Sequence, residues 1–336
     1  MKNVYRTGII SLLVLLMIMP LACAHNLHIE TDTSPGMPVN TPHEIDAKIL
    51  FGHPDDPESF YLTDMRSINI YTPDGSFYTL DPEARDNYWL VQIVMEKPGD
   101  YILVAERQPS VYNPKSHGGP DSPRLTVEHA KTVINAGTQE NWHLKPDIEF
   151  DVVPLVNPYN LRSGDTFKAQ LLYRGEPIEG TYMASPADQD IHSQSQAGKT
   201  DENGIFSVTI DKSGMWQIQG NFAVEESGTW EATFTHHAGS FNESDLLDYD
   251  RTAYRTTMTL WANPSHDSRV SELEYQLNEV QDANSKLQED VNQISSNLEA
   301  GIQNSSSSQP LAYAGVGIAL VALLFSGWLM VSLKKK

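Results

Sequence analysis

The residues of this chain that could do chemistry are histidines, and one of them follows a signal-peptidase cleavage site. Residues 22–24 read Ala-Cys-Ala, so cleavage there would make His25 the first residue of the mature chain. The free α-amine and the imidazole of His25 would then form a chelating pair, with His28 three residues further on. Nitrogen donors of this kind suit nickel(II), cobalt(II) and copper(II) ions.

Three more histidines complete the predicted metal site. His53 follows a strand-like run and precedes an acidic loop, whereas His236 and His237 follow a run predicted as a strand over residues 229–235. Because side chains alternate along a strand, we expect at most one of this pair to face a site. The predicted ligands are His25, His28, His53, His236 and His237.

Three interpretations of these histidines compete. The protein captures a nickel or cobalt ion without catalysis; or it holds copper in an oxidase site like the histidine brace of polysaccharide monooxygenases; or it is a stalked adhesion module that binds no metal. The sequence contains no His-Glu-x-x-His, no phosphate-binding glycine loop and no EF-hand loop. His117-Gly118-Gly119-Pro120 has no accompanying Gly-x-Ser-x-Gly, so a hydrolase is not supported. We predict that the protein is not an enzyme.

Both termini predict a membrane-anchored extracellular protein. Residues 1–24 combine a basic start with an apolar run, as in a signal peptide. Acylation of Cys23 is the alternative, although Pro20 stands where a lipobox takes an aliphatic residue. Residues 311–333 carry no charge and would form about 34 Å of helix, enough to cross a bilayer. Three lysines follow, so we expect a single-pass cell-membrane protein with its ectodomain outside and residues 334–336 in the cytoplasm. A secreted protein with a processed tail is the alternative.

The composition excludes several partners. The formal net charge is −21, and the basic residues at the termini (Lys2, Arg6 and the last three lysines) make the predicted ectodomain more acidic still. This argues against binding to nucleic acid or anionic lipid, and fits either attraction of cations or solubility in a salty medium. Cys23 is the only cysteine and would leave with the signal peptide, so a metal site must use nitrogen and oxygen ligands.

The middle of the chain predicts a mainly β protein made of two tandem β-sandwiches, residues 25–147 and 148–262. Short β-type runs, residues 88–95 and 166–173 among them, alternate with turns such as Pro73-Asp74-Gly75 and Pro98-Gly99-Asp100. Residues 108–128, rich in Pro, Ser and Gly, indicate a long loop. The pattern of turns between Gly175 and Gly214 resembles a small prealbumin-like or carboxypeptidase-regulatory-like sandwich, which predicts fold and not function.

Beyond residue 264 the pattern changes to a heptad repeat. Apolar residues recur at alternating steps of three and four, which predicts a coiled-coil stalk over residues 266–300 and a flexible linker over residues 301–310. Asn284 is the one polar residue at an a position, which favours a parallel homodimer. A helix packed against the sandwich is the alternative.

Four segments in order carry a resemblance to a known family: residues 24–29, residues 51–54, residues 153–159, and the turns between Gly175 and Gly214. Together they resemble the extracytoplasmic nickel-uptake family, long catalogued as a domain of unknown function. Its members accompany energy-coupling-factor nickel/cobalt transporters. The resemblance implies a metal-binding accessory protein, with His25 and His53 as the residues carried over. The prediction that His28 and His236 or His237 are ligands is based on their local sequence alone.

Overall fold

The computed structural model describes residues 25–32, 41–137, 142–191 and 195–304. Residues up to Ser265 form one compact unit, and the chain from His266 onward forms a second. The predicted signal peptide, the predicted membrane span and the predicted tail lie outside the described residues. Within the described part of the chain, no helix combines the length and apolar character needed to cross a membrane.

The first unit is mainly β, as predicted, and its centre is a nine-stranded sheet. The order along this sheet is β14-β13-β16-β19-β9-β7-β3-β4, and β8 also pairs with β9. Its strands are β14 (Gln196–Lys199), β13 (Thr181–Pro186), β16 (Gly214–Val224), β19 (Arg251–Ala262), β9 (Arg124–Ala136), β7 (Gly99–Arg107), β3 (Met65–Tyr71), β4 (Phe77–Thr79) and β8 (Ser110–Tyr112). The segment predicted as a loop over residues 108–128 therefore contains β8 and the first residues of β9.

Two smaller sheets and a two-stranded ribbon complete the unit. One sheet has the order β1-β2-β6-β5, the second pairs β10, β11, β12 and β15, and the ribbon joins β17 and β18. Their strands are β1 (Asn26–Thr31), β2 (His43–Gly52), β6 (Tyr88–Met95) and β5 (Glu83–Ala84); β10 (Phe150–Pro154), β11 (Thr166–Tyr173), β12 (Glu176–Pro177) and β15 (Ile205–Thr209); β17 (Gly228–Glu231) and β18 (Leu246–Tyr249). Short 3-10 helices cover Pro57–Ser59 and Pro114–His117.

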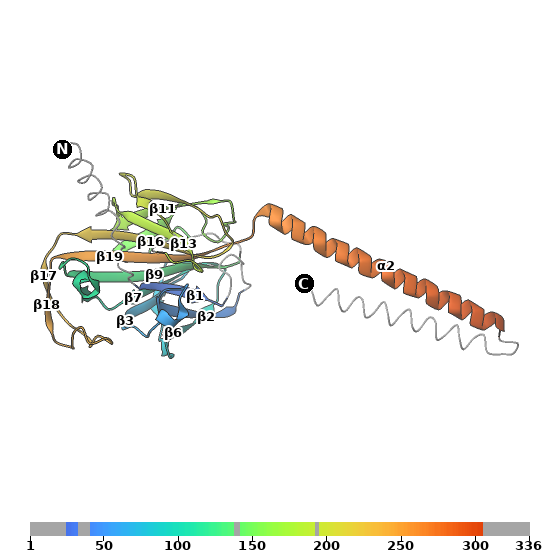
Figure 1. Cartoon of the computed structure of the whole chain (residues 1–336), viewed down its shortest axis with the longest axis horizontal. Helices are drawn as coiled ribbons and strands as arrows, with labels where there is room; N and C mark the ends of the chain where they lie inside the picture. Colours follow the sequence, from blue (N-terminus) through green and yellow to red (C-terminus); the bar gives the residue numbers. More distant parts are fainter. Residues whose placement is uncertain (1–24, 33–40, 138–141, 192–194, 305–336) are drawn as a thin grey trace, which may run out of the picture. The chain divides into compact units, whose positions relative to one another are not determined.

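These sheets form three layers, with the nine-stranded sheet in the middle (Figure 1). Along β7, Ile102 and Val104 belong to the hydrophobic core shared with Phe150 of β10. Leu103, between them, belongs to the opposite core, shared with Ile49 of β2. A strand covered on both faces reads as a continuous apolar run, and β7 does so.

The two predicted sandwiches therefore share one sheet. The predicted division at residues 147 and 148 falls between β9 and β10, but β9 from the first half pairs in parallel with β19 from the second half. An antiparallel hairpin can be recognised in a sequence by the short turn between its strands. Parallel strands have no such turn, so the pairing of β9 with β19 could not be predicted from a local pattern. The halves form a single unit.

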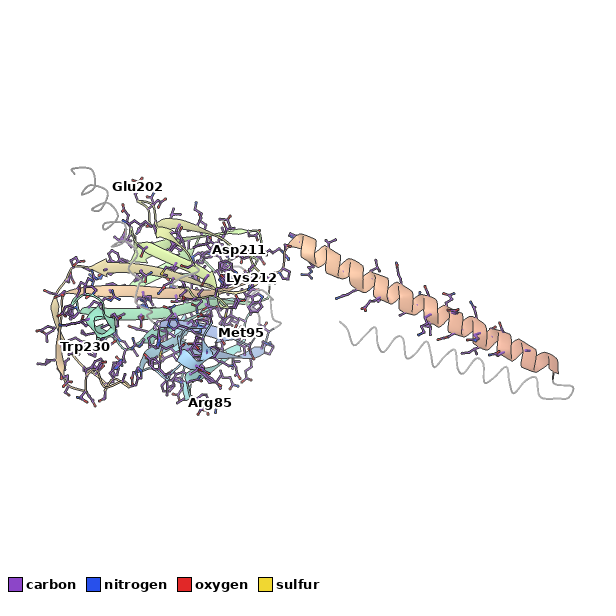
Figure 2. All side chains as sticks on the ribbon, in the orientation of Figure 1. Arg85, Met95, Glu202, Asp211, Lys212 and Trp230 are labelled. Carbon is purple, nitrogen blue, oxygen red and sulfur yellow. The ribbon has the colours of Figure 1, made fainter. Side chains whose placement is uncertain are left out.

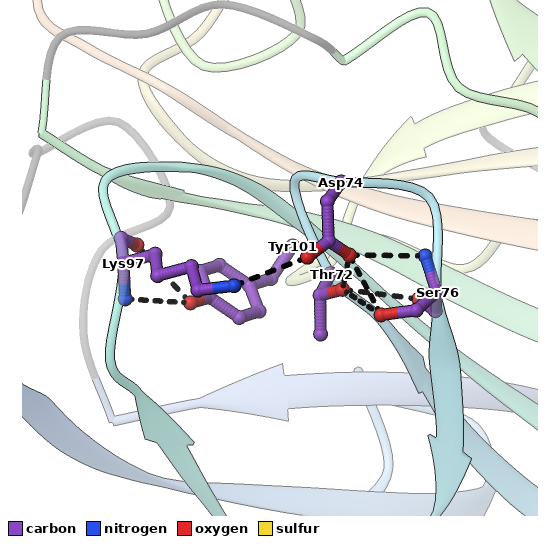
Figure 3. A network of polar contacts seen from close by, with 5 residues as sticks. All are labelled: Thr72, Asp74, Ser76, Lys97 and Tyr101. Carbon is purple, nitrogen blue, oxygen red and sulfur yellow. Dashed lines mark hydrogen bonds and ion pairs between the residues drawn. The ribbon is translucent and has the colours of Figure 1, made fainter.

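Two predicted turns lie side by side and bind one another (Figure 3). The Asp74 carboxylate accepts hydrogen bonds from the hydroxyls of Thr72 and Ser76, and from the Lys97 ammonium at 3.1 Å. The Tyr101 hydroxyl in turn donates to the Lys97 carbonyl. The bonds from Ser76 and Thr72 lower the pKa of Asp74. These contacts join the β3–β4 turn to the turn that precedes β7.

A buried ion pair joins the middle layer to the second sheet. Lys131 of β9 is 1% exposed, and its ammonium lies 2.5 Å from a carboxylate oxygen of Asp151 on β10. A charge this deeply buried is tolerated only when it is paired. The pair therefore couples β9 to β10 across the predicted boundary.

The second unit contains α2 (His266–Asn304), so the predicted helix is present. The helix continues past Gly301, where the flexible linker was expected to begin. One glycine costs about 1 kcal/mol and does not by itself stop a propagating helix. The predicted heptad positions Val270, Leu273, Leu277 and Val280 are 52%, 55%, 57% and 57% exposed. Figure 2 shows side chains projecting outward along the helix.

Candidate metal centre

His25 and His53 meet at the end of the β1–β2 pair. The register of this pair runs from Thr31 with Ala47 to Asn26 with Gly52, so the next residues outward are His25 and His53. Their imidazole centroids are 4.9 Å apart and their planes are nearly perpendicular, at 89°. Two neighbouring strands thus place two nitrogen-bearing rings edge to face.

Tyr61 extends this pair into a larger cluster. Its ring lies 5.3 Å from the His25 ring, 5.2 Å from Phe51, and 3.8 Å from His237, on which it stacks. The Tyr61 main chain is held by a hydrogen bond from its N–H to the Phe51 carbonyl. Tyr61 therefore stands between the first two histidines and His237, whose position in the sequence is far from both.

The prediction for His236 and His237 is wrong in its geometry. β17 ends at Glu231, and both histidines lie in the loop that connects it to β18. Their rings are 4.5 Å apart instead of pointing to opposite faces. The chain leaves the ribbon because hydrogen bonds within the loop replace strand pairing: the His236 N–H donates to the Phe241 carbonyl, and the Gly239 N–H donates to the His236 carbonyl.

An aromatic group holds this loop. Phe241 is buried and packs against Trp230 and Phe234, each at 5.3 Å between ring centroids, and against His236 at 5.2 Å. Figure 2 places Trp230 at one end of the body, away from Asp211 and Lys212 at the other. The loop thus has a small core of its own, which fixes the histidine pair beside Tyr61.

The environment favours the neutral form of the His25, His236 and His237 imidazoles. Burial, followed by the proximity of His53 and His237, lowers the pKa of His25 to about 4. Burial and then His237 lower the pKa of His236 to about 4. The pKa of His237 is lowered by burial and by the Arg107 guanidinium. A neutral imidazole is the form that binds metals, so at neutral pH these rings need not lose a proton to do so.

His28 does not belong to this cluster. It is fully buried on the opposite face of β1 from His25, 5.5 Å from the Phe60 ring and 3.8 Å from a Glu30 carboxylate oxygen. The alternation of side chains along β1 causes this separation, because residues 25 and 28 differ by an odd number of positions. His28 is therefore a packing residue of the interior.

The side chains alone do not form a complete site. Among the residues that the structure describes, no three His, Cys, Asp or Glu side chains are grouped as metal ligands require. His25 and His53 supply two nitrogens, and an α-amine on His25 would supply a third. Three nitrogen donors fit a tetragonal nickel(II) or copper(II) site, and also cobalt(II).

Charged groups beside the cluster were not predicted from the sequence. Glu128 of β9 is 3% exposed and lies between the guanidinium groups of Arg107 and Arg255. Arg107 also lies over the Phe51 ring, 4.3 Å from its centroid. No pattern within a single segment of the sequence predicts this network, because its members come from three different strands: β7, β9 and β19.

The comparisons with known proteins bear on the family. The sequence profile of a family described as Domain of unknown function (DUF4198) matches residues 22–223. The chain belongs to the DUF4198 family. The DUF4198 match includes His25, His28, His53 and Glu128 but ends before the loop that carries His236 and His237. No curated protein matches the chain.

Solved structures show only distant likeness to this DUF4198 protein. A DUF4785 family protein from Legionella pneumophila is 12% identical, with a TM-score of 0.21, over 57% of this chain and 50% of that chain. The adhesin InvE from Yersinia pseudotuberculosis is 11% identical, with a TM-score of 0.20, over 72% of this chain and 63% of that chain. The chain thus spans about half the length of the Legionella protein.

Proposed function

We propose that this protein captures a divalent transition-metal ion outside the cytoplasmic membrane and passes it to a transporter. The observation that carries the proposal is the perpendicular pair of His25 and His53, 4.9 Å apart, at the end of β1 and β2. The α-amine of His25, released by cleavage after Ala24, is the third donor. The proposal therefore rests on the predicted signal peptide.

The surroundings of the pair support binding without catalysis. The low pKa of His25 keeps its imidazole available at neutral pH. His237 stacks on the Tyr61 ring that also contacts His25, so it lies beside the pair, and its proximity further lowers the pKa of His25. The strong acidity of the chain raises the local concentration of cations.

Nickel or cobalt is the proposed cargo because of the resemblance to the nickel-uptake family. The proposed partner is accordingly an energy-coupling-factor nickel/cobalt transporter, since one predicted span cannot itself form a channel. Intrinsic ligand chemistry favours copper(II) over nickel(II) and cobalt(II), so copper must be compared directly.

The test is metal titration of the full-length protein with His25 verified as its first residue by mass spectrometry. Nickel, cobalt and copper ions are each titrated, by calorimetry, into this form and into a form with one extra alanine before His25. We expect one-to-one binding that His53→Ala and the extra alanine each weaken strongly. His143→Ala is the matched control, because His143 is exposed and lies outside the cluster.

The outcomes separate the three interpretations. Preference for nickel or cobalt supports uptake, and its physiological counterpart is metal accumulation that depends on both this protein and the transporter. Preference for copper together with ascorbate-dependent oxidation would support the oxidase instead. Binding of no metal by either form would refute the proposal and leave a stalked interaction protein.

We also propose that α2 joins two copies of the chain. The apolar positions Val270, Leu273, Leu277 and Val280 are more than half exposed in a single copy, although they follow the spacing of a coiled-coil seam. A parallel dimer would bury this seam and pair Asn284 with its counterpart. Two capture sites would then belong to one anchored assembly.

A further inference from the structure

A buried carboxylate beside the candidate metal centre is shared by two arginines. One carboxylate oxygen of Glu128 accepts from Arg107 Nη1 at 2.9 Å, and the other accepts from Arg255 Nη1 at 3.0 Å. The side chains of Glu128, Arg107 and Arg255 are 3%, 8% and 15% exposed. Charge-assisted hydrogen bonds in such a setting are short and hold their groups in a defined geometry.

Arg255 extends this network to the main chain of the first residue of the predicted mature protein. The same Nη1 group donates to the His25 carbonyl oxygen at 3.0 Å and approaches the Asn26 side-chain oxygen at 3.4 Å. Gln219 of β16 also donates to that Asn26 oxygen, at 3.3 Å. Residues 25 and 26 are therefore tied to β16, β19 and, through Glu128, to β9.

Arg107 ties the other side of the cluster to the same carboxylate. Its Nε donates to the Thr63 hydroxyl at 2.7 Å, and its guanidinium covers the Phe51 ring. Phe51 and Thr63 flank the segment that carries His53 and Tyr61. Glu128 thus sets the position of the His25 main chain relative to the segment after β2 that bears His53.

The position of the His25 carbonyl matters because β1 begins only at Asn26. Rotation about the bond between the α-carbon and the carbonyl carbon of His25 moves the amine and the imidazole together. A carbonyl held in place fixes the α-carbon and the axis of this rotation before any metal arrives, so the amine and the imidazole turn about a defined axis beside His53. Ligands that are already oriented bind with less loss of conformational entropy.

We propose that Arg255 is a positioning residue for metal capture, which holds the His25 main chain so that the amine and imidazole of His25 reach the same ion as His53. This inference rests on the proposed function. Arg255 touches no metal in this arrangement and acts through the His25 carbonyl and the neighbouring Asn26 side chain. Removing such supporting contacts usually weakens metal binding by about tenfold to a hundredfold.

The test is a double-mutant cycle on the full-length protein processed to begin at His25. Arg255→Met is combined with the extra alanine before His25, and nickel affinity is measured for all four forms. We expect Arg255→Met to weaken binding about tenfold or more when the amine is free, and less than about twofold when the extra residue has already blocked it. Arg66→Met is the matched control, because Arg66 is an exposed arginine paired with Glu106 away from His25.

A spectroscopic measurement at saturating metal reports whether the amine coordinates the ion, even in variants that bind the ion weakly. With saturating copper(II), the electron paramagnetic resonance spectrum of Arg255→Met should shift toward that of the blocked protein, because the amine is no longer held for coordination. Thermal unfolding verifies that the variant folds. If it does not fold, Glu128→Gln, which loosens Arg255 by removing the charge that holds it, is carried through the same cycle.

The outcomes of the cycle distinguish the positioning role of Arg255 from the proposed metal capture. Equal losses in the free and blocked forms, or no loss in the free form, would overturn the positioning role while leaving metal capture intact. Failure of the unaltered, processed protein to bind nickel, cobalt or copper would overturn the proposed function itself, and the role of Arg255 with it.

Discussion

Acidification should destabilise the metal-free protein, and His25 should account for a measurable share of the loss. The pKa of His25 is about 4 in the folded chain, against an ordinary value of 6.5. Because the folded-state pKa is lowered, the stability that depends on the neutral imidazole is complete above pH 6.5. It is lost as the pH falls from about 6.5 toward 4, since the unfolded chain takes up the proton first.

The magnitude follows from these two pKa values. For an imidazole fully shielded from solvent, lowering the pH from 7 to 5 would reduce the free energy of unfolding by about 2 kcal/mol. His25 is only partly buried, and solvent screening reduces this to about 1 kcal/mol. His236 has the same lowered pKa and should contribute a similar amount.

Urea unfolding of residues 25–265, a range that contains all the described residues of both hydrophobic cores, provides the assay. The free energy of unfolding is measured at pH 7 and pH 5 for the unaltered sequence and for His25→Gln. Titration of the carboxylates affects both forms alike, so it cancels in the comparison. We expect the pH-dependent loss to be smaller in His25→Gln by about 1 kcal/mol. Identical losses in the two forms would refute the reasoning that His25 is held neutral in the folded protein.

Three further predictions concern stability and assembly. Lysine at both Leu277 and Val280 should convert the full-length protein from dimer to monomer by light scattering, because it places charge in the seam; a mass that does not change would count against the coiled coil. Trp216→Ala should lower the free energy of unfolding by about 3–5 kcal/mol in denaturant titration, because Trp216 is fully buried in the core; a loss below about 1 kcal/mol would contradict this packing. Lys131→Met should cost about 3–5 kcal/mol by leaving Asp151 buried without its partner. Adding Asp151→Leu should recover much of that loss, and a purely additive second loss would argue against the pair.

Features that depend on nearby residues could be predicted from the amino-acid sequence. Short runs of β-forming residues between turns located β6 and β11 with their observed bounds, because strand propensity and turn chemistry are local properties. The heptad pattern located α2 for the same reason. His25 and His53 were also found from the sequence, one from the cleavage site and one from the end of a strand-like run.

The packing of strands and loops determines which of the predicted ligands lie close together. The alternation of side chains along β1 places His28 on the opposite face from His25. His236 and His237 lie close together in a loop, although the sequence of residues 229–235 resembles a strand. The joining of the two halves through β9 and β19, and the ion pair of Glu128 with Arg255, connect residues more than a hundred positions apart. Such contacts form when separate strands pack into layers, and no spacing within a single segment encodes them.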